Sequence, residues 1–322
     1  MTRSPFDQLS PDLILTAVER AGFRPTGETI QLNSYENRVF DVRVESEEKS
    51  VIAKFYRPGR WSAAALQDEH EFLADLRSEG IPAVAPLLPA FQHGDFLTAI
   101  FPKIFARMPQ ELFDDDLKEV GRLLARLHNI GARRPFQHRP ILSAETYGYD
   151  ALDRLDRFVY PELWHRYRDA AEAICEYIED ELDPRDRIRI HGDCHKGNLL
   201  RTDPRGGTRP EFFFVDFDDC CQGPPIQDFY MLLSGAIDVD ETAANELETL
   251  LDGYEELRKV PTNLHLIEAL RGLRIIHYAG WIAARWSDPF FPSLFPAFQG
   301  GRDSYNYWVD ECLRLEQIAN NL

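Results

Sequence analysis

Cysteine, positive charge and long apolar runs are all scarce in this sequence. Only five of the 322 residues are cysteines, and no two of them form a C-x-x-C pair. This sparse, odd set argues against a disulfide framework and predicts a reduced, cytoplasmic protein. The 36 Lys and Arg are outnumbered by 54 Asp and Glu, which gives a net charge of −18. We expect so acidic a chain not to bind nucleic acid, because a phosphate backbone requires clustered positive charge.

No apolar run approaches the roughly 18 residues of a membrane span, and the first residues lack the apolar core of a signal peptide. We therefore expect no membrane partner. Internal repeats and low-complexity tracts are also missing, and no charge or repeat feature indicates an obligate oligomer, so we expect a monomer. A hydrophobic fraction of 44% is ordinary for a globular chain, and the length favours two domains or lobes.

The N-terminal third has the signals of strands together with two helices. Residues 38–44 alternate so that Phe40, Val42 and Val44 share one face, the period of a strand with one wet side. Ser10 and Ser62 are typical helix N-caps. The expected elements are helices from Pro11 to about Gly22 and from Ser62 to about Glu79, strands at 29–32, 38–44, 49–55 and 96–102, and a polar turn at 45–50.

Helical signals predominate after Asp114. Helices are expected at 114–129, 162–182, 226–258, 262–285 and 303–321, with short strands near 188–191, 198–201 and 212–216 and a turn at 203–210. A β-rich part followed by a helix-rich part predicts an α+β fold of two lobes, residues 1–103 and 104–322.

The strongest chemical signal is H-G-D-C-H-K-G-N at 191–198, followed by F-F-F-V-D at 212–216. An apolar run that ends in a carboxylate predicts a buried strand that delivers Asp216 into a cleft. Hard Mg²⁺ prefers carboxylate and amide oxygens, which Asp216 and Asn198 provide. Asp193 lies on the same loop as Asn198 and is placed to orient an acceptor hydroxyl and take its proton. The pattern predicts phosphoryl transfer, in which positioning and charge neutralisation supply most of the rate.

This arrangement resembles the aminoglycoside phosphotransferase and choline kinase group, whose H-G-D-x-x-x-x-N loop parallels that of protein kinases. Several stretches more closely resemble the bacterial stress response kinase A family. They are L-N-S-Y-E-N-R-V at 32–39, A-K-F-Y-R-P-G-R-W at 53–61, H-G-D-C-H at 191–195, G-P-P-I-Q-D at 223–228 and R-W-S-D-P at 285–289. The resemblance implies a protein-kinase-like fold, ATP and Mg²⁺ as cofactors, and a cytoplasmic Ser/Thr protein kinase of the bacterial stress response that can autophosphorylate.

The same resemblance implies roles for the residues of the second lobe. Asp193 matches the catalytic base, and Asn198 and Asp216 match the metal ligands. Asp228 matches a buried residue that braces the catalytic loop through backbone N–H groups, which is a structural role.

The resemblance also implies roles in the first lobe. Lys54 matches the lysine that holds the α- and β-phosphates, and its apolar strand supports that interpretation. Glu69, favoured by helical spacing over Glu71, matches the ion-pair partner that orients Lys54. Ser34 matches a position in the turn that covers the nucleotide.

Two departures from ordinary protein kinases bear on the acceptor. Residues 33–37 stand where a G-x-G-x-x-G turn is expected, and the motif at Asp216 reads D-F-D instead of D-F-G. The segment 223–228 follows directly, so no activation loop ending in A-P-E is visible. A protein substrate would therefore need a different docking surface.

The identity of the acceptor stays open at this point. An acidic second lobe would suit a cationic small molecule, so a kinase for an amino alcohol, homoserine or an aminoglycoside is the alternative to a protein kinase. A nucleotide-binding regulator without catalysis is a third hypothesis. The joint presence of Lys54, Asp193, Asn198 and Asp216 argues against it, because a pseudokinase typically lacks one of these groups.

Two other patterns have simpler explanations. His191, Asp193 and His195 could suggest a transition-metal site, but Gly192 indicates a loop, in which alternate side chains need not converge. Arg57 and Arg60 could bind phosphate, although a solvated loop is the preferred interpretation.

The cysteines near the catalytic segments admit a redox hypothesis. Cys194 adjoins the expected base, and Cys220 and Cys221 follow Asp216. A redox switch is conceivable there. Free cysteines are more often small buried hydrophobes, which is the preferred interpretation.

Overall fold

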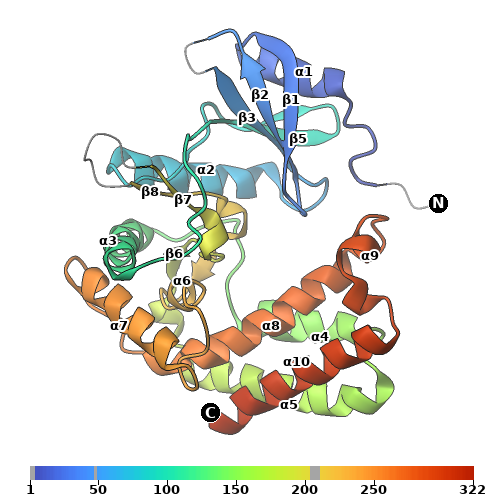
Figure 1. Ribbon diagram of the computed structural model, residues 1–322, viewed down its shortest axis with the longest axis vertical. Helices are drawn as coiled ribbons and strands as arrows, with labels where there is room; N and C mark the ends of the chain where they lie inside the picture. The colour runs from blue at the N-terminus through green and yellow to red at the C-terminus, as the bar shows by residue number, and fades with distance from the viewer. Residues whose placement is uncertain (1–3, 47–48, 204–210) are drawn as a thin grey trace.

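The computed structural model describes residues 4–46, 49–203 and 211–322. The chain forms a small β-rich lobe above a larger helical lobe (Figure 1), which confirms the predicted α+β, kinase-like fold. The first lobe contains one antiparallel sheet in the order β1-β2-β3-β5-β4. Its elements are α1 (Pro11–Arg20), β1 (Pro25–Leu32), β2 (Arg38–Val44), β3 (Ser50–Phe55), α2 (Ala63–Ser78), β4 (Phe91–His93) and β5 (Phe96–Pro102).

The two helices of the first lobe begin where the sequence predicts. The side chain of Ser10 accepts the N–H of Leu13, and that of Ser62 accepts the N–H of Ala65, so each serine satisfies one of the N–H groups left free at a helix start. Helix α1 packs its apolar side into a core with strands β2, β3 and β5. Helix α2 lies between the sheet and the helical lobe (Figure 1) and contributes to the core of the latter.

The second lobe consists mainly of helices. They are α3 (Asp114–Gly131), a π-helical turn (Glu145–Tyr149), α4 (Asp150–Leu155), α5 (Pro161–Glu181), α6 (Gln227–Tyr230), α7 (Glu241–Glu255), α8 (Ile267–Ala284), α9 (Phe291–Leu294) and α10 (Arg302–Asn321). Single 3-10 turns lie at Pro184–Asp186, Lys196–Asn198, Phe217–Asp219, Leu264–Leu266 and Pro296–Phe298. Helices α4, α5, α8 and α10 share one apolar core, and every helix in the described ranges is too short or too polar to span a bilayer.

Two short strand pairs hold the chemical motifs. Strand β6 (Ile188–Ile190) pairs with β9 (Cys221–Gly223), and β7 (Leu199–Arg201) pairs with β8 (Phe212–Phe214). The loop 191–198 therefore leaves β6 and enters β7, while Asp216 follows β8 closely. Because both ladders are antiparallel, they bring this loop and Asp216 to the same side of the lobe.

The structure corrects one predicted element and adds others. The single helix expected at 226–258 is wrong, because α6 ends at Tyr230 and α7 begins only after Asp240. The side chain of Asp240 accepts the N–H groups of Thr242 and Ala243, a cap that starts a new helix. Strands β4 and β9 and helix α4 were not predicted, because such short elements have too few residues for a clear period. Of the expected turns, 203–210 lies almost wholly outside the described residues, and 45–50 lies partly outside them.

Candidate functional site

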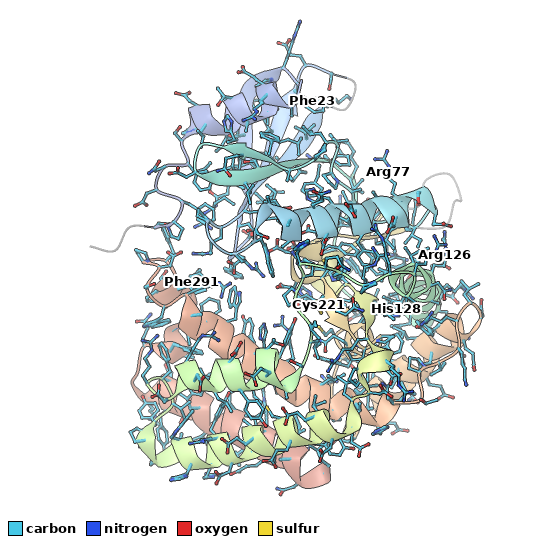
Figure 2. The ribbon with its side chains drawn as sticks, turned by 180° about the vertical axis from the view of Figure 1, so that it is seen from behind. Phe23, Arg77, Arg126, His128, Cys221 and Phe291 are labelled. Atoms are coloured by element: carbon cyan, nitrogen blue, oxygen red, sulfur yellow. The ribbon has the colours of Figure 1, made fainter. Side chains whose placement is uncertain are left out.

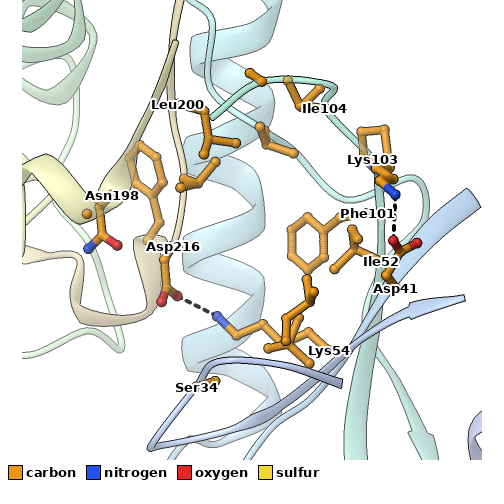
Figure 3. A pocket seen from close by; sticks show the side chains of 18 of the residues that line it. Ser34, Asp41, Ile52, Lys54, Phe101, Lys103, Ile104, Asn198, Leu200 and Asp216 are labelled. Atoms are coloured by element: carbon orange, nitrogen blue, oxygen red, sulfur yellow. Dashed lines mark hydrogen bonds and ion pairs between the residues drawn. The ribbon is translucent and has the colours of Figure 1, made fainter. Parts of the chain in front are cut away.

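Lys54 of β3 joins the two lobes at the site. Its Nζ lies 2.8 Å from Asp216 Oδ1 and 3.2 Å from Asp218 Oδ1, and Figure 3 shows the first of these pairs. Burial by itself would lower the pKa of Lys54, but the two carboxylates outweigh it and raise the pKa well above its ordinary value. The ammonium group is therefore charged, and it ties the sheet to the segment after β8.

A cavity of about 560 Å³ lies between the sheet and this segment, a size typical of small-ligand sites. Ser34, Lys54, Glu69, Asn198 and Asp216 all line it, so the structure brings these expected site residues together. Its apolar walls come from both lobes and include Val39, Ile52, Phe101, Ile104, Leu200 and Val215. Figure 3 shows Ile52 and Phe101 on the far side of the Lys54 ammonium group from Asp216, with Leu200 above Asp216 and Ile104 at the top of the view. The cavity thus combines apolar walls with a charged region at Lys54 and Asp216, and the ion pair of Lys103 with Asp41 also lines it.

Asp216 has a constrained backbone. Its φ of 59° places it in the left-handed region, where Lys49 is the one other non-glycine residue among 4–46, 49–203 and 211–322. Such conformations persist where the surrounding structure fixes them, and they cluster at functional sites. The Asp216 side chain stays 52% exposed, so its carboxylate remains accessible to a ligand.

Asp228 braces the loop between β6 and β7, as expected. Its two oxygens accept the N–H groups of His191 and Gly192 at 2.9 and 2.8 Å. The buried His128 ring contacts it at 3.1 Å and reaches Tyr254 at 3.0 Å on the other side, and Figure 2 shows His128 beside the green helix α3 in the larger lobe. The loop is therefore attached to α3 and α7 through one carboxylate.

His191 connects the same loop to the end of β8. Its Nε2 lies 3.0 Å from the carbonyl oxygen of Val215, which requires the proton on Nε2. The ring is fully buried and packs on Phe217 with centroids 4.4 Å apart. Within the described ranges no three His, Cys, Asp or Glu side chains form a group that could hold a metal ion, so the transition-metal interpretation of this motif has no geometric support.

Asp193 has a partner that sequence reasoning missed. Arg274 of α8 places Nη2 2.6 Å from Asp193 Oδ1, while the amide of Asn198 donates to the Asp193 carbonyl oxygen at 2.9 Å. Burial would raise the pKa of Asp193, but Arg274 and then His195 outweigh it and hold the pKa below its ordinary range. No local signal marks Arg274, which lies in α8, 81 residues from Asp193 in the sequence.

Glu69 does not form the ion pair expected of it. It is 1% exposed and lines the cavity, but its ion pair is with Arg139 at 3.6 Å. Lys54 is instead held by Asp216 and Asp218, which occupy its ammonium group. Burial raises the pKa of Glu69 to about 7, although Lys54 and Arg139 oppose the shift.

The interpretation of Arg57 and Arg60 as solvated loop residues is wrong. Both side chains are only 10% exposed. Arg60 lies 2.5 Å from Asp218 and 2.5 Å from Asp219, the acidic residues that follow Asp216. These two carboxylates were not singled out from the sequence, although the D-F-D departure from D-F-G marked their position.

Asp216 and Asn198 fit a magnesium ion. Mg²⁺ takes few protein ligands, typically carboxylate and neutral oxygen atoms, and fills its remaining positions with phosphate and water. The Asn198 amide nitrogen donates to the Asp193 carbonyl oxygen, and Figure 3 shows the Asn198 amide oxygen on the side of Asp216. The donor set is therefore appropriate for a magnesium ion.

The cysteines near the site are buried. Cys194, Cys220 and Cys221 are each fully buried, and Figure 2 shows Cys221 inside the larger lobe. Burial raises the pKa of all three thiols, which disfavours the reactive thiolate. Their environment matches that of small core hydrophobes.

Bacterial proteins named as kinases match nearly the whole chain. The model of the phosphotransferase enzyme family matches residues 28–262. Stress response kinase A of Escherichia coli (strain K12) is 35% identical over 328 residues, which cover 98% of this chain and 94% of that protein. Serine/threonine protein kinase RdoA of Salmonella typhimurium is 35% identical over 314 residues, which cover 94% and 90% of the two chains.

Solved structures share the fold at lower identity. A microcompartment-associated aminopropanol kinase aligns with a TM-score of 0.69 and 21% identity over 95% of this chain and 96% of that one. Spectinomycin phosphotransferase in complex with ADP and spectinomycin aligns with a TM-score of 0.59 and 16% identity over 92% and 93%. The family match and the near full-length relatives together show that this chain is an enzyme of the phosphotransferase enzyme family, in the group of stress response kinase A.

Proposed function

We propose that the protein is an ATP- and Mg²⁺-dependent Ser/Thr protein kinase that transfers the γ-phosphoryl group to protein hydroxyls, including its own. One observation carries the proposal: Lys54 and Asp216 pair across the lobes in a cavity that Asn198 also lines, and Asn198 donates to Asp193 just outside it. The names of the 35%-identical relatives support a protein acceptor and a role in stress response.

The nucleotide fits the cavity by its polarity. The apolar walls at Val39, Ile52 and Leu200 suit the adenine ring. The charged region at Lys54 and Asp216 suits the phosphates. Lys54 would neutralise the α- and β-phosphates once they compete with Asp216 for its ammonium group. Ser34, whose hydroxyl accepts the N–H of Asn37 at 3.3 Å, shapes the turn that would cover them. Glu69 also lines the cavity, but its ion pair is with Arg139 and not with Lys54.

The metal would be held by Asp216 and Asn198. When bound, Mg²⁺ would supply positive charge that offsets the negative charge of the phosphoryl group during transfer. The exposed Asp216 carboxylate follows β8, and the Asn198 oxygen, on its Asp216 side, directly precedes β7. Their separate backbone anchors fix the site before the nucleotide arrives.

Asp193 would orient the acceptor hydroxyl. Arg274 occupies Oδ1 at 2.6 Å, while Oδ2 has only the longer contacts with Asn198 Nδ2 at 3.4 Å and His195 Nε2 at 3.5 Å, so Oδ2 is the oxygen that would accept the hydroxyl proton. A carboxylate with a lowered pKa is a weak base, so its main effect is to position the oxygen in line with the phosphoryl group. Proton transfer then follows late, as suits a loose transition state.

The second candidate is a small-molecule kinase. Structural neighbours are named as kinases of aminopropanol and spectinomycin, so the fold accommodates amino alcohol or aminoglycoside acceptors. Under this candidate the nucleotide and metal sites are the same, and only the acceptor differs.

The two candidates are separated by following label from γ-labelled ATP with Mg²⁺. The acceptors are casein, a basic protein, and a panel of amino alcohols and aminoglycosides, with Asp193→Asn as the inactive control. We expect label on the protein itself and on a protein acceptor. Label on a small molecule alone would support the second candidate, and ATP binding without any transfer would favour a non-catalytic regulator.

A further inference from the structure

A second cavity begins at Arg274, the residue that holds Asp193. It measures about 430 Å³, and its lining residues differ from those of the nucleotide cavity. The walls come from α8 and α10, with Tyr230 and Met231 at the end of α6. Because Arg274 contacts both this cavity and the expected base, a group bound here would present its hydroxyl near Asp193.

Arginine dominates the charge of this acceptor cavity. Arg271, Arg274 and Arg314 line it, and Glu311 is the single carboxylate among its described lining residues. Glu311 is itself paired with Arg314 at 3.3 Å. Each arginine already has one carboxylate neighbour, at Glu268, Asp193 and Glu311 respectively, but a guanidinium group has five N–H donors. Donors remain for a further anion.

Two of the three tyrosine rings that line the cavity each have one of the protein's own arginines over them. An ammonium group is recognised by open aromatic faces or by carboxylates. Here Arg271 lies over the Tyr230 ring at 5.2 Å, and Arg274 lies over the Tyr278 ring at 5.7 Å. At these two rings the protein's own arginines therefore occupy a position that a choline-like or amino alcohol acceptor would use.

We propose that this cavity receives the acceptor and selects a hydroxyl on an acidic peptide segment, a Ser or Thr flanked by Asp or Glu. The planar guanidinium fork suits carboxylates in two-point contact. The inference rests on the proposed function and names its substrate class. It also differs from the expectation based on net charge: the chain is acidic as a whole, yet three arginine side chains line the cavity next to Asp193.

The test compares short peptides with one serine among glutamates, among alanines or among lysines. We expect kcat/KM to be highest for the acidic peptide and to decrease as salt is added. Arg271→Gln and Arg314→Gln should each raise KM for the acidic peptide about three- to tenfold, and leave the alanine peptide nearly unchanged. Arg168→Gln is the matched control, because Arg168 forms an exposed ion pair with Glu172 on α5, outside this cavity.

The outcomes distinguish this inference from the function on which it rests. Phosphorylation of all three peptides at equal efficiency, or a preference for lysine, would overturn the acidic selection and leave the protein kinase intact. Label on an amino alcohol and on no peptide would overturn both. Arg314 is 66% exposed, so its variant should fold normally, and a melting curve checks this.

A different observation carries a second inference, about the turn at 33–37. Its residue Glu36 is 8% exposed and lies at the centre of a buried charge cluster. Its carboxylate contacts Arg57 Nε at 2.9 Å, Trp281 Nε1 at 2.8 Å and Arg285 Nε at 2.5 Å. Glu36, Arg57 and Arg285 belong to three of the segments that resemble the stress response kinase A family, at 32–39, 53–61 and 285–289. These three segments thus meet at the carboxylate of Glu36.

The cluster also reaches the D-F-D segment. Arg60 lies 3.5 Å from Glu36 and 2.5 Å from Asp218, and the amide of Asn37 donates to Asp218 at 3.0 Å. On the other side, Arg57 pairs with Asp288 at 3.0 Å. The turn above the cavity, the end of α8 and the residues after Asp216 are therefore tied together by ion pairs.

One face of α8 connects this cluster to the base. Arg274, Trp281 and Arg285 are spaced by seven and four residues, so they lie on the same side of the helix. Arg274 fixes Asp193, while the other two fix Glu36. We infer that Glu36 is a positioning residue that holds the turn over the phosphates, in place of a flexible glycine-rich loop.

Glu36→Gln tests this role through ATP kinetics. The variant should raise KM for ATP about tenfold, the loss expected for a charge-assisted contact, with KM for the acceptor unchanged. Glu28→Gln is the control, because Glu28 forms an exposed pair with Arg43 at 2.8 Å on the same sheet. A lower melting temperature with an unchanged KM for ATP would overturn the inference and leave Glu36 a purely structural residue. Arg285→Lys should restore part of the ATP affinity lost in Arg285→Gln, because it keeps the charge.

Discussion

Arg274 Nη2 lies 2.6 Å from Asp193 Oδ1. An arginine of α8 therefore holds the carboxylate that is expected to accept the proton of the acceptor hydroxyl. The contact sets both the position and the ionisation of Asp193. Burial alone would favour the protonated acid, and Arg274 is the main group that reverses this effect. The position and ionisation of Asp193, the expected base, thus depend on two segments that are far apart in the sequence.

Arg274→Gln should therefore move the pH dependence of catalysis. Loss of the guanidinium group raises the pKa of Asp193, so the acid limb of the kcat/KM profile should move to higher pH, because the ionised carboxylate must accept the hydroxyl proton. A pH–rate profile of variant and parent measures the shift. Arg271→Gln, one turn away on α8, should leave the acid limb in place. Coincident acid limbs in Arg274→Gln and the parent would show that Arg274 does not control this ionisation.

Asp193→Asn and Asp216→Asn should have different effects on ATP binding. Asp193→Asn should reduce phosphoryl transfer about 10²- to 10⁴-fold, and ATP affinity should stay nearly constant, because Asp193 does not line the nucleotide cavity. Asp216→Asn should also weaken ATP binding, and only when Mg²⁺ is present. Titration calorimetry with and without Mg²⁺ separates the two. Full turnover by Asp193→Asn would refute its assigned role.

Glu69 should make stability depend on pH. Its pKa in the folded protein is raised from 4.5 to about 7, so folding favours the protonated acid. Its contribution to the free energy of unfolding is complete below about pH 4.5 and is lost as the pH rises towards 7. Glu69→Gln should flatten this decline in melting temperature over that range. A parallel decline in variant and parent would show that Glu69 ionises normally.

Gly192 should not tolerate alanine. Its φ is 83°, and an added Cβ would clash with the backbone carbonyl of Asp219. Gly192→Ala should destabilise the protein by more than the roughly 1 kcal/mol typical of left-handed strain and lower kcat, because the loop that carries Asp193 must move. Gly27→Ala is the matched control: its φ is 95°, but nothing lies within 4 Å of an added Cβ. Equal losses of melting temperature would indicate that the clash is relieved by a harmless shift.

The motif residues were the predictable part of the site. Asp193 and Asn198 lie on one short loop, and Asp216 follows an apolar strand, so local spacing already limits their separation. The periodicity of 38–44 and the caps at Ser10 and Ser62 likewise predicted elements that the structure contains. The single helix expected at 226–258 failed, because a cap at Asp240 interrupts a pattern that looks continuous in hydrophobicity. The exact division of the lobes at 103–104 stays a prediction.

The sequence by itself determined the chemistry of the site, because motif residues close together in the chain meet through local geometry alone. Only the tertiary structure decided their partners. Lys54 pairs with Asp216 and Asp218 while Glu69 pairs with Arg139, and Arg274 and Arg285 reach Asp193 and Glu36 from α8. A charged side chain takes the oppositely charged group that packing brings within a few ångströms, and residue spacing does not encode that choice between distant segments.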